Sequence, residues 1–217
     1  MTKLFIKDTE QTILVLAPHT DDGEIGCGAT MAKLVDDGHR VIYLAFSAAE
    51  QSVPAGMPRD TLRTEVRNAT RRIGLHPEDC IVLDFEVRDF PRQRQKILDC
   101  MIHYGEKFNP SVVFLPSGGD THQDHKTIAE EAFRAFKRTT MLGYEIPWNN
   151  LSFVTSCFVE VSEAHLERKV EALMEYRSQY GRTYVNRDYI RSLAATRGMM
   201  IKRSYAEVFE VVRVIID

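Results

Sequence analysis

The sequence lacks several features that would place the protein in a special class. The four cysteines, at positions 27, 80, 100 and 157, are widely spaced and form no CxxC pair, which argues against a secreted disulfide framework and favours reduced thiols. No apolar run approaches the roughly 18 residues that a transmembrane helix needs. Residues 1–10 lack the basic start, apolar core and cleavage site of a secretory signal. We therefore expect a cytoplasmic protein with no integral membrane segment.

An excess of charge of one sign is also lacking. The chain has 28 lysine and arginine residues against 31 aspartate and glutamate residues, a formal net charge of -3. This balance gives no general attraction to nucleic acid or to an anionic membrane, so any phosphate binding has to be local. No repeat or low-complexity linker divides the sequence, and 44% of its residues are hydrophobic. We expect residues 1–217 to form a single domain with a substantial core.

Buried strands and helices alternate along the chain. Strands are predicted at residues 12–17, 41–46, 80–85, 111–116, 151–161 and 205–216, and helices at residues 24–37, 59–73, 93–108, 124–138, 163–176 and 188–197. Such alternation predicts an α/β fold with a Rossmann-like, mostly parallel sheet and helices on both faces. The less regular last third should add strands to the sheet and a cap over its crevice.

Two loops rich in histidine and aspartate follow the first and the fourth predicted strands. The first contains HTDD and the second GGDTHQDH. Ligands of such sheets bind beyond the carboxyl ends of the strands, so both loops should face one crevice. Adjacent aspartates directly after the apolar run ILVLA are costly to bury unless they are paired or bind a metal. The candidate functional side chains are His19, Asp21, Asp22, His122, Asp124 and His125.

These side chains suit a catalytic metal centre. His19 and Asp22 can converge across a tight turn, and one donor from the second loop would complete a three-ligand set with an open position, as catalytic zinc requires. Two histidines and one carboxylate suit Zn²⁺, and Fe²⁺ or Mn²⁺ would also fit. The second aspartate can accept a proton from water that the metal activates, and the remaining histidine can stabilise an oxyanion. The set predicts metal-assisted hydrolysis.

For each loop taken alone, a purely structural role stays open. An aspartate after a strand commonly caps a helix, and Gly26 and Gly28 would also serve close packing of helix on strand. The two loops together favour a shared site. A dinucleotide site is disfavoured, because the glycines follow a GxxGxG pattern and not GxGxxG, and the neighbouring carboxylates would repel a pyrophosphate.

The sequence resembles the PIG-L/LmbE-like family of zinc-dependent de-N-acetylases. The similarity lies in APHTDDGEIGCG at 17–28 and HQDH at 122–125, with weaker similarity in EYRSQY at 175–180 and YAEVFEV at 205–211. The roles that this resemblance carries over by position are zinc binding by His19, Asp22 and His125, proton acceptance by Asp21, polarisation of the carbonyl oxygen by His122, and orientation of a histidine by Asp124. The family usually has proline where this chain has Thr20, which should loosen the turn without removing a ligand.

The resemblance implies zinc-dependent removal of the acetyl group from an N-acetylated sugar of the N-acetylglucosamine type. The sugar would be part of a glycoconjugate or be linked to a nucleotide or a lipid. Two alternatives remain: hydrolysis of a different N-acyl amide, and non-catalytic sugar binding on the same fold. The expected partner is a small-molecule sugar and not nucleic acid, and a homo-oligomer stays open.

Candidate substrate contacts are weaker. The family often has a substrate-binding arginine in the helix after the second strand, which would make Arg63 the candidate, although a solvated helix face explains it equally well. The only tryptophan, Trp148, can stack on a sugar, or it can serve as a packing anchor or an oligomer contact. Near the exit of the third strand, Arg88, Arg92 and Arg94 form either a site for a phosphate or carboxylate or a surface turn.

Overall fold

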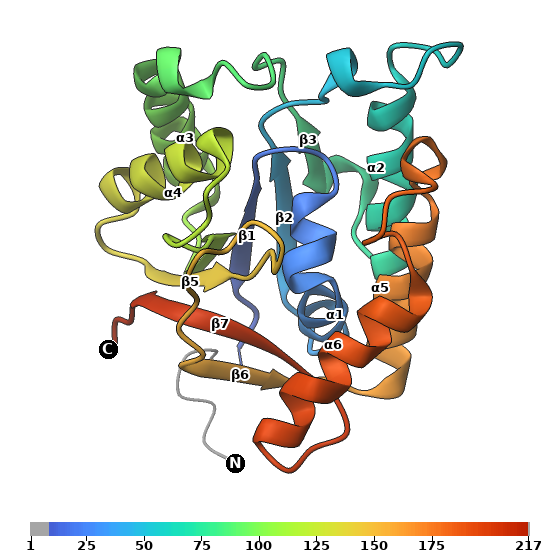
Figure 1. The fold of residues 1–217 in the computed structure, drawn as a ribbon. Helices are drawn as coiled ribbons and strands as arrows, with labels where there is room; N and C mark the ends of the chain where they lie inside the picture. Colours follow the sequence, from blue (N-terminus) through green and yellow to red (C-terminus); the bar gives the residue numbers. More distant parts are fainter. Residues whose placement is uncertain (1–8, 217) are drawn as a thin grey trace.

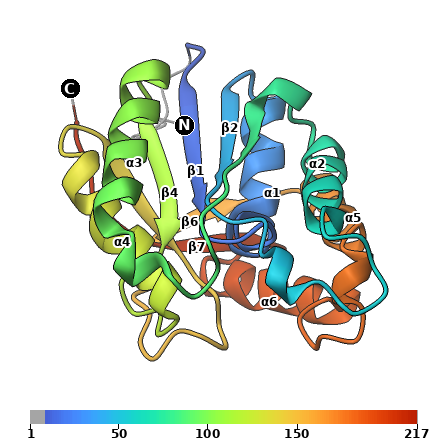
Figure 2. The ribbon, with the colours of Figure 1, turned by 90° about the horizontal axis from the view of Figure 1, so that it is seen from above.

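The computed structural model describes residues 9–216, whose strands form one seven-stranded sheet with helices on both faces (Figure 1, Figure 2). In spatial order the strands are β3 (Cys80–Val82), β2 (Arg40–Ala45), β1 (Thr12–Ala17), β4 (Val112–Pro116), β5 (Thr140–Tyr144), β7 (Ala206–Arg213) and β6 (Cys157–Glu160). Neighbours from β3 to β5 are parallel, whereas β7 is antiparallel to both β5 and β6. The predicted Rossmann-like, mostly parallel sheet is confirmed.

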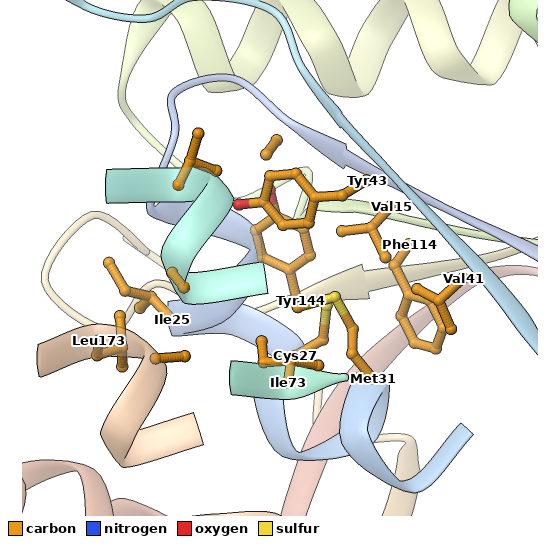
Figure 3. Packing of buried hydrophobic residues seen from close by; sticks show 14 of the residues in the cluster. Val15, Ile25, Cys27, Met31, Val41, Tyr43, Ile73, Phe114, Tyr144 and Leu173 are labelled. Atoms are coloured by element: carbon orange, nitrogen blue, oxygen red, sulfur yellow. The ribbon is translucent and has the colours of Figure 1, made fainter. Parts of the chain in front are cut away.

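The described helices form two layers. They are α1 (Asp22–Asp36), α2 (Thr61–Ile73), α3 (Arg94–Phe108), α4 (Gln123–Ala135), α5 (Glu163–Met174) and α6 (Arg187–Met200). Helices α1, α2, α5 and α6 share one hydrophobic core with one face of the sheet, and α3 and α4 share a second core with the other face (Figure 2). Figure 3 shows Ile25 of α1 beside Leu173 of α5 in the first core.

Strand β1 shows why the sequence of such a strand is continuously apolar. Ile13 and Val15 enter the first core, while Leu14 and Leu16 enter the second. Successive side chains of a strand point to opposite faces, so a strand that is covered on both faces has no position for a polar residue. The first polar side chains after β1 therefore lie beyond its carboxyl end, where the sheet is open.

Two predicted strands are shorter in the structure, and one strand of the sheet was not predicted. The strand predicted at 80–85 is confined to β3, and the one predicted at 151–161 is confined to β6. Strand β5 was not predicted, because its five residues, TMLGY, include a glycine and directly follow a helical pattern. All five residues of β5 are buried, and pairing with β4 and β7 defines the strand.

A buried ion pair anchors α1 to the sheet. The backbone of α1 departs from helical angles at Cys27, and the Glu207 carboxylate of β7 accepts hydrogen bonds from the N–H groups of residues 29–30 beyond this kink. Lys169 of α5 lies 2.6 Å from Glu207 and neutralises its charge. A kink leaves backbone donors without helical partners, and this carboxylate supplies acceptors for two of them.

No helix within residues 9–216 is long and apolar enough to cross a membrane. All four cysteines are free thiols. The expectation of no secretory signal concerns residues 1–10. Of these, residues 1–8 lie outside the described residues.

Candidate active site

The loop after β1 and the loop after β4 meet at the carboxyl end of the sheet. Strands β1 and β4 are parallel neighbours, so their carboxyl ends lie side by side. The Nδ1 atom of His19 lies 3.1 Å from Oδ2 of Asp22, and Nε2 of His125 lies 3.2 Å from the same oxygen. The two nitrogens are 3.3 Å apart. Three donor atoms from two distant loops thus form a nearly equilateral triangle.

This triangle has the dimensions of one face of a metal coordination sphere. A tetrahedral zinc ion with bonds of about 2.0–2.1 Å holds its ligand atoms roughly 3.3 Å apart. His122 lies beside the triangle. A second possible ligand set consists of one ring nitrogen from each of His19, His122 and His125, and these nitrogens lie within 4.8 Å of one another. The set that includes Asp22 has three measured edges close to the tetrahedral value, so it fits a single ion more closely.

The outer nitrogen of each histidine in the triangle is held by a buried carboxylate. Nε2 of His19 lies 3.0 Å from Oδ2 of Asp124, and Nδ1 of His125 lies 2.7 Å from Oδ2 of Asp120. A proton on each outer nitrogen leaves a lone pair on each inner nitrogen, which is the tautomer that a metal ligand needs. Asp120 was missed in the sequence, although it stands two residues before His122 in the second loop.

Electrostatics at the triangle favour a positive charge. Burial disfavours the charged form of His19, but the carboxylates of Asp22 and Asp124 outweigh it and raise the pKa of His19 to about 9. Burial is likewise outweighed at His125, where Asp22 and Asp120 raise the pKa to about 10. Burial would raise the pKa of Asp22, but the two histidines hold it well below its usual range. A proton or a metal cation can supply the charge that this arrangement stabilises.

Asp21 and His122 border the triangle from two sides. Burial, together with the charge of Asp22, raises the pKa of Asp21 to about 6, and its Oδ2 accepts a hydrogen bond of 3.3 Å from the Tyr184 hydroxyl. Burial and the neighbouring His125 lower the pKa of His122. Nδ1 of His122 accepts the backbone N–H of Asp124 at 3.2 Å, so the proton of the neutral ring is on Nε2. The site thus offers a proton acceptor and a neutral hydrogen-bond donor.

A buried acid that the sequence analysis did not single out supports the turn between β1 and α1. Glu24 accepts hydrogen bonds from the hydroxyls of Tyr43 and Tyr176, the latter at 2.9 Å. The same two hydroxyls lie 2.8 and 2.5 Å from the backbone oxygen of Thr20. Burial raises the pKa of Glu24 to about 8. These contacts hold the turn at Thr20.

A cavity of about 270 Å³ opens over the triangle. His19, Asp21, Asp22, His122 and His125 line it on one side. Segments from elsewhere in the chain supply the rest of its wall, including Arg88, Trp148, Gln179, Arg182 and Tyr184. Trp148 stacks on Tyr184 with 4.7 Å between ring centroids and an angle of 13°, yet 47% of its surface remains exposed. The segment between α5 and α6 therefore helps to enclose the cavity.

Other predicted substrate contacts lie outside this cavity. Arg63 pairs with Glu50 at 3.0 Å and with Asp84, and it lines a neighbouring cavity of about 290 Å³. The Arg92 side chain is 88% exposed, and Arg94 of α3 forms ion pairs with two glutamates of α4. Of the three arginines near the exit of β3, Arg88 alone lines the cavity over the triangle.

Comparison with known proteins places the chain in a family of deacetylases. The family model for PIG-L, described as GlcNAc-PI de-N-acetylase, matches residues 14–136, which is more than half of the chain. The protein therefore belongs to the PIG-L family, as the two motifs predicted.

Two curated relatives and one solved structure are similar over most of the chain. YaiS of Escherichia coli (strain K12), described as an uncharacterized deacetylase, is 28% identical over 76% of this chain and 90% of its own length. Diacetylchitobiose deacetylase of Thermococcus kodakarensis is 24% identical over 90% of this chain and 80% of its own length. The crystal structure of the conserved protein TT1542 from Thermus thermophilus has a TM-score of 0.76 and 28% identity, covering 95% of this chain and 97% of that chain.

Proposed function

We propose that the protein is a zinc-dependent hydrolase that removes the acetyl group from an N-acetylated sugar. The main support is the triangle of His19 Nδ1, Asp22 Oδ2 and His125 Nε2. Its edges of 3.1 to 3.3 Å match the distances between ligand atoms around a tetrahedral zinc ion. Two imidazoles and one carboxylate with an open fourth position are the donor set of a catalytic zinc site, and Fe²⁺ or Mn²⁺ could take the same position. When bound, zinc supplies Lewis-acid chemistry, because it lowers the pKa of water and polarises an acyl oxygen.

The residues around the triangle supply the remaining chemistry. With a pKa raised to about 6, Asp21 is mostly ionised at neutral pH and accepts a proton from the attacking water. The carbonyl oxygen becomes negative as the water oxygen bonds to the acyl carbon, and the Nε2–H group of His122 donates a hydrogen bond to it. The carbon–nitrogen bond then breaks, and the proton that Asp21 holds passes to the leaving amine. Acetate and a free amino sugar are the products.

The sugar is supported by a relative and by the cavity wall. The Thermococcus kodakarensis relative is a diacetylchitobiose deacetylase, which acts on N-acetylated sugar units. In this chain, the exposed ring of Trp148 lies on the wall of the cavity. The apolar face of a sugar packs on such a ring, so we assign Trp148 to substrate binding.

Metal content and turnover, measured together, test the assignment. The zinc-loaded protein should release acetate from N-acetylglucosamine or its derivatives, whereas other N-acyl amides of the same sugar should react more slowly. Asp21→Ala should keep stoichiometric zinc by elemental analysis while turnover falls by about 10²- to 10⁴-fold, the usual contribution of a general base. Asp22→Ala should lose the metal. If Asp21→Ala loses zinc and Asp22→Ala keeps it, the two roles are reversed.

The alternative functions predict different results with the same protein. Faster release of a different acyl group would identify another amide as the substrate. Binding of N-acetylated sugars without stoichiometric metal and without turnover would identify a sugar-binding protein.

A further inference from the structure

Two arginine side chains on the wall of the cavity have no acidic partner. Arg88 comes from the segment between β3 and α3, and Arg182 comes from the segment between α5 and α6. Within residues 9–216, neither guanidinium group lies within ion-pair distance of a carboxylate. Both residues line the cavity that contains His19, Asp21 and Asp22, so both can reach one substrate molecule.

Three other arginines near this end of the molecule are neutralised by carboxylates. Arg63 pairs with Glu50 and Asp84, and Arg197 pairs with Glu145 at 2.6 Å. Arg94 likewise pairs with glutamates of α4. Carboxylates of the chain thus neutralise these three arginines, whereas Arg88 and Arg182 on the cavity wall have no such partner. An anion from outside the chain is the partner that their chemistry calls for.

The backbone at Arg88 is held in place at some energetic cost. Its φ of 70° lies in the left-handed region, which is uncommon for a residue with a long side chain. Its N–H group donates to Oδ2 of Asp124 at 2.7 Å, and its carbonyl oxygen accepts a hydrogen bond from the Gln123 side chain. Because Asp124 also holds His19, the position of Arg88 is fixed relative to the triangle of donor atoms.

Arg182 is placed by the aromatic side of the cavity. Its guanidinium carbon lies 6.0 Å from the ring centroid of Tyr184, which stacks on Trp148 and donates a hydrogen bond to Asp21. A guanidinium group over an aromatic ring keeps its N–H groups available at the ring edge. Tyr184 therefore contacts both Arg182 and Asp21, the proton acceptor of the proposed reaction.

We propose that Arg88 and Arg182 form an anion subsite, and that the substrate is an N-acetylated sugar carrying a phosphate or a carboxylate group. The proposal depends on the proposed deacetylase function and adds the class of its substrate. Guanidinium groups bind phosphate and carboxylate oxygens through two parallel hydrogen bonds, which recognises the anion by geometry as well as by charge. A neutral N-acetylated sugar would leave both arginines without a partner.

Kinetics with charged and neutral substrates of the zinc-loaded protein test this subsite. The substrates are N-acetylglucosamine and its methyl glycoside as neutral sugars, N-acetylglucosamine 1-phosphate and UDP-N-acetylglucosamine as phosphates, and N-acetylglucosaminuronic acid as a carboxylate. We expect kcat/KM for at least one anionic substrate to exceed that for the neutral sugars by about 10-fold or more, since a hydrogen bond to a charged group contributes that much. The best anionic substrate identifies the source of the charge.

Matched variants distinguish binding of the anion by these two arginines from a general effect of the protein's positive charge. Arg88→Gln and Arg182→Gln should each lower kcat/KM for the preferred anionic substrate by about 10-fold or more, and by a larger factor than for the neutral sugars. Arg92→Gln and Arg177→Gln remove the same charge from the same two segments but do not line the cavity, so they should leave both values unchanged.

Product binding gives a readout that is independent of turnover. Calorimetry should show that glucosamine 1-phosphate binds the wild-type protein more tightly than glucosamine, and that Arg88→Gln and Arg182→Gln remove the difference. Equal kcat/KM for charged and neutral sugars, or unchanged values in both variants, would overturn the subsite and leave the deacetylase intact. If no N-acetylated sugar of either class is hydrolysed, the proposed function itself fails.

Discussion

Replacing Asp120 should weaken the proposed metal centre without removing any of its ligands. Asp120 is 3% exposed, and its two oxygens serve two different parts of the second loop. Oδ2 lies 2.7 Å from Nδ1 of His125, and Oδ1 accepts the backbone N–H of His122 at 2.8 Å. Removal of the side chain therefore frees the His125 ring to take the wrong tautomer and also loosens the loop that carries His122.

The magnitude follows from the two contacts. Loss of a carboxylate that orients a metal-binding histidine typically lowers metal affinity by ~10- to 100-fold, or about 1.4 to 2.8 kcal/mol. Asp120→Ala loses both contacts and should lie near the upper end of this range. Asp120→Asn keeps an oxygen that can accept the His125 Nδ1–H group but loses the negative charge, so it should lie near the lower end.

Competition with a chromogenic chelator at neutral pH measures the zinc affinity of each variant. Asp60→Asn is the matched control, because Asp60 is exposed, precedes α2 and makes no capping hydrogen bond. Thermal unfolding of the metal-free proteins checks that each variant is folded. Zinc affinity of Asp120→Ala equal to that of the wild type would refute the argument that this carboxylate prepares His125 for a metal.

Two further predictions concern folding around the site. Burial raises the pKa of Glu24 from 4.5 to about 8, so its contribution to the stability of the metal-free protein is fully present below about pH 4.5 and is lost as the pH rises through 8. Urea unfolding measures the free energy of unfolding at pH 5 and at pH 8. Its decrease between these pH values should be larger for the wild type than for Glu24→Gln, and equal decreases would contradict this. In Gly26→Ala, the new Cβ would overlap the ring of Tyr144, so unfolding should require about 1 to 3 kcal/mol less. Gly118→Ala, which meets no atom within 4 Å, should melt like the wild type, and a normal melting temperature for Gly26→Ala would exclude the clash.

The sequence was sufficient for the parts of the fold whose residues carry a periodic or continuous pattern. Strand β1 could be predicted because a strand buried on both faces is a continuous run of apolar residues. The helices could be predicted because burial of one face gives apolar residues at helical spacing. Strand β5 could not, because its five residues contain a glycine and become a strand through pairing with β4 and β7. The residues of a short segment do not determine which strands will pair with it.

The site divides in the same way. The sequence by itself determined which residue types follow β1 and β4, and so which chemistry is available at that edge of the sheet. Only the tertiary structure decided that Asp120 holds His125, that Asp124 holds His19, and that Arg88 and Arg182 reach the same cavity while Arg63 does not. These contacts join residues through side-chain directions and loop paths that no spacing along the chain encodes. A motif can therefore name candidate donors for a metal, but the partners of these donors and the charges around the cavity depend on how distant segments pack.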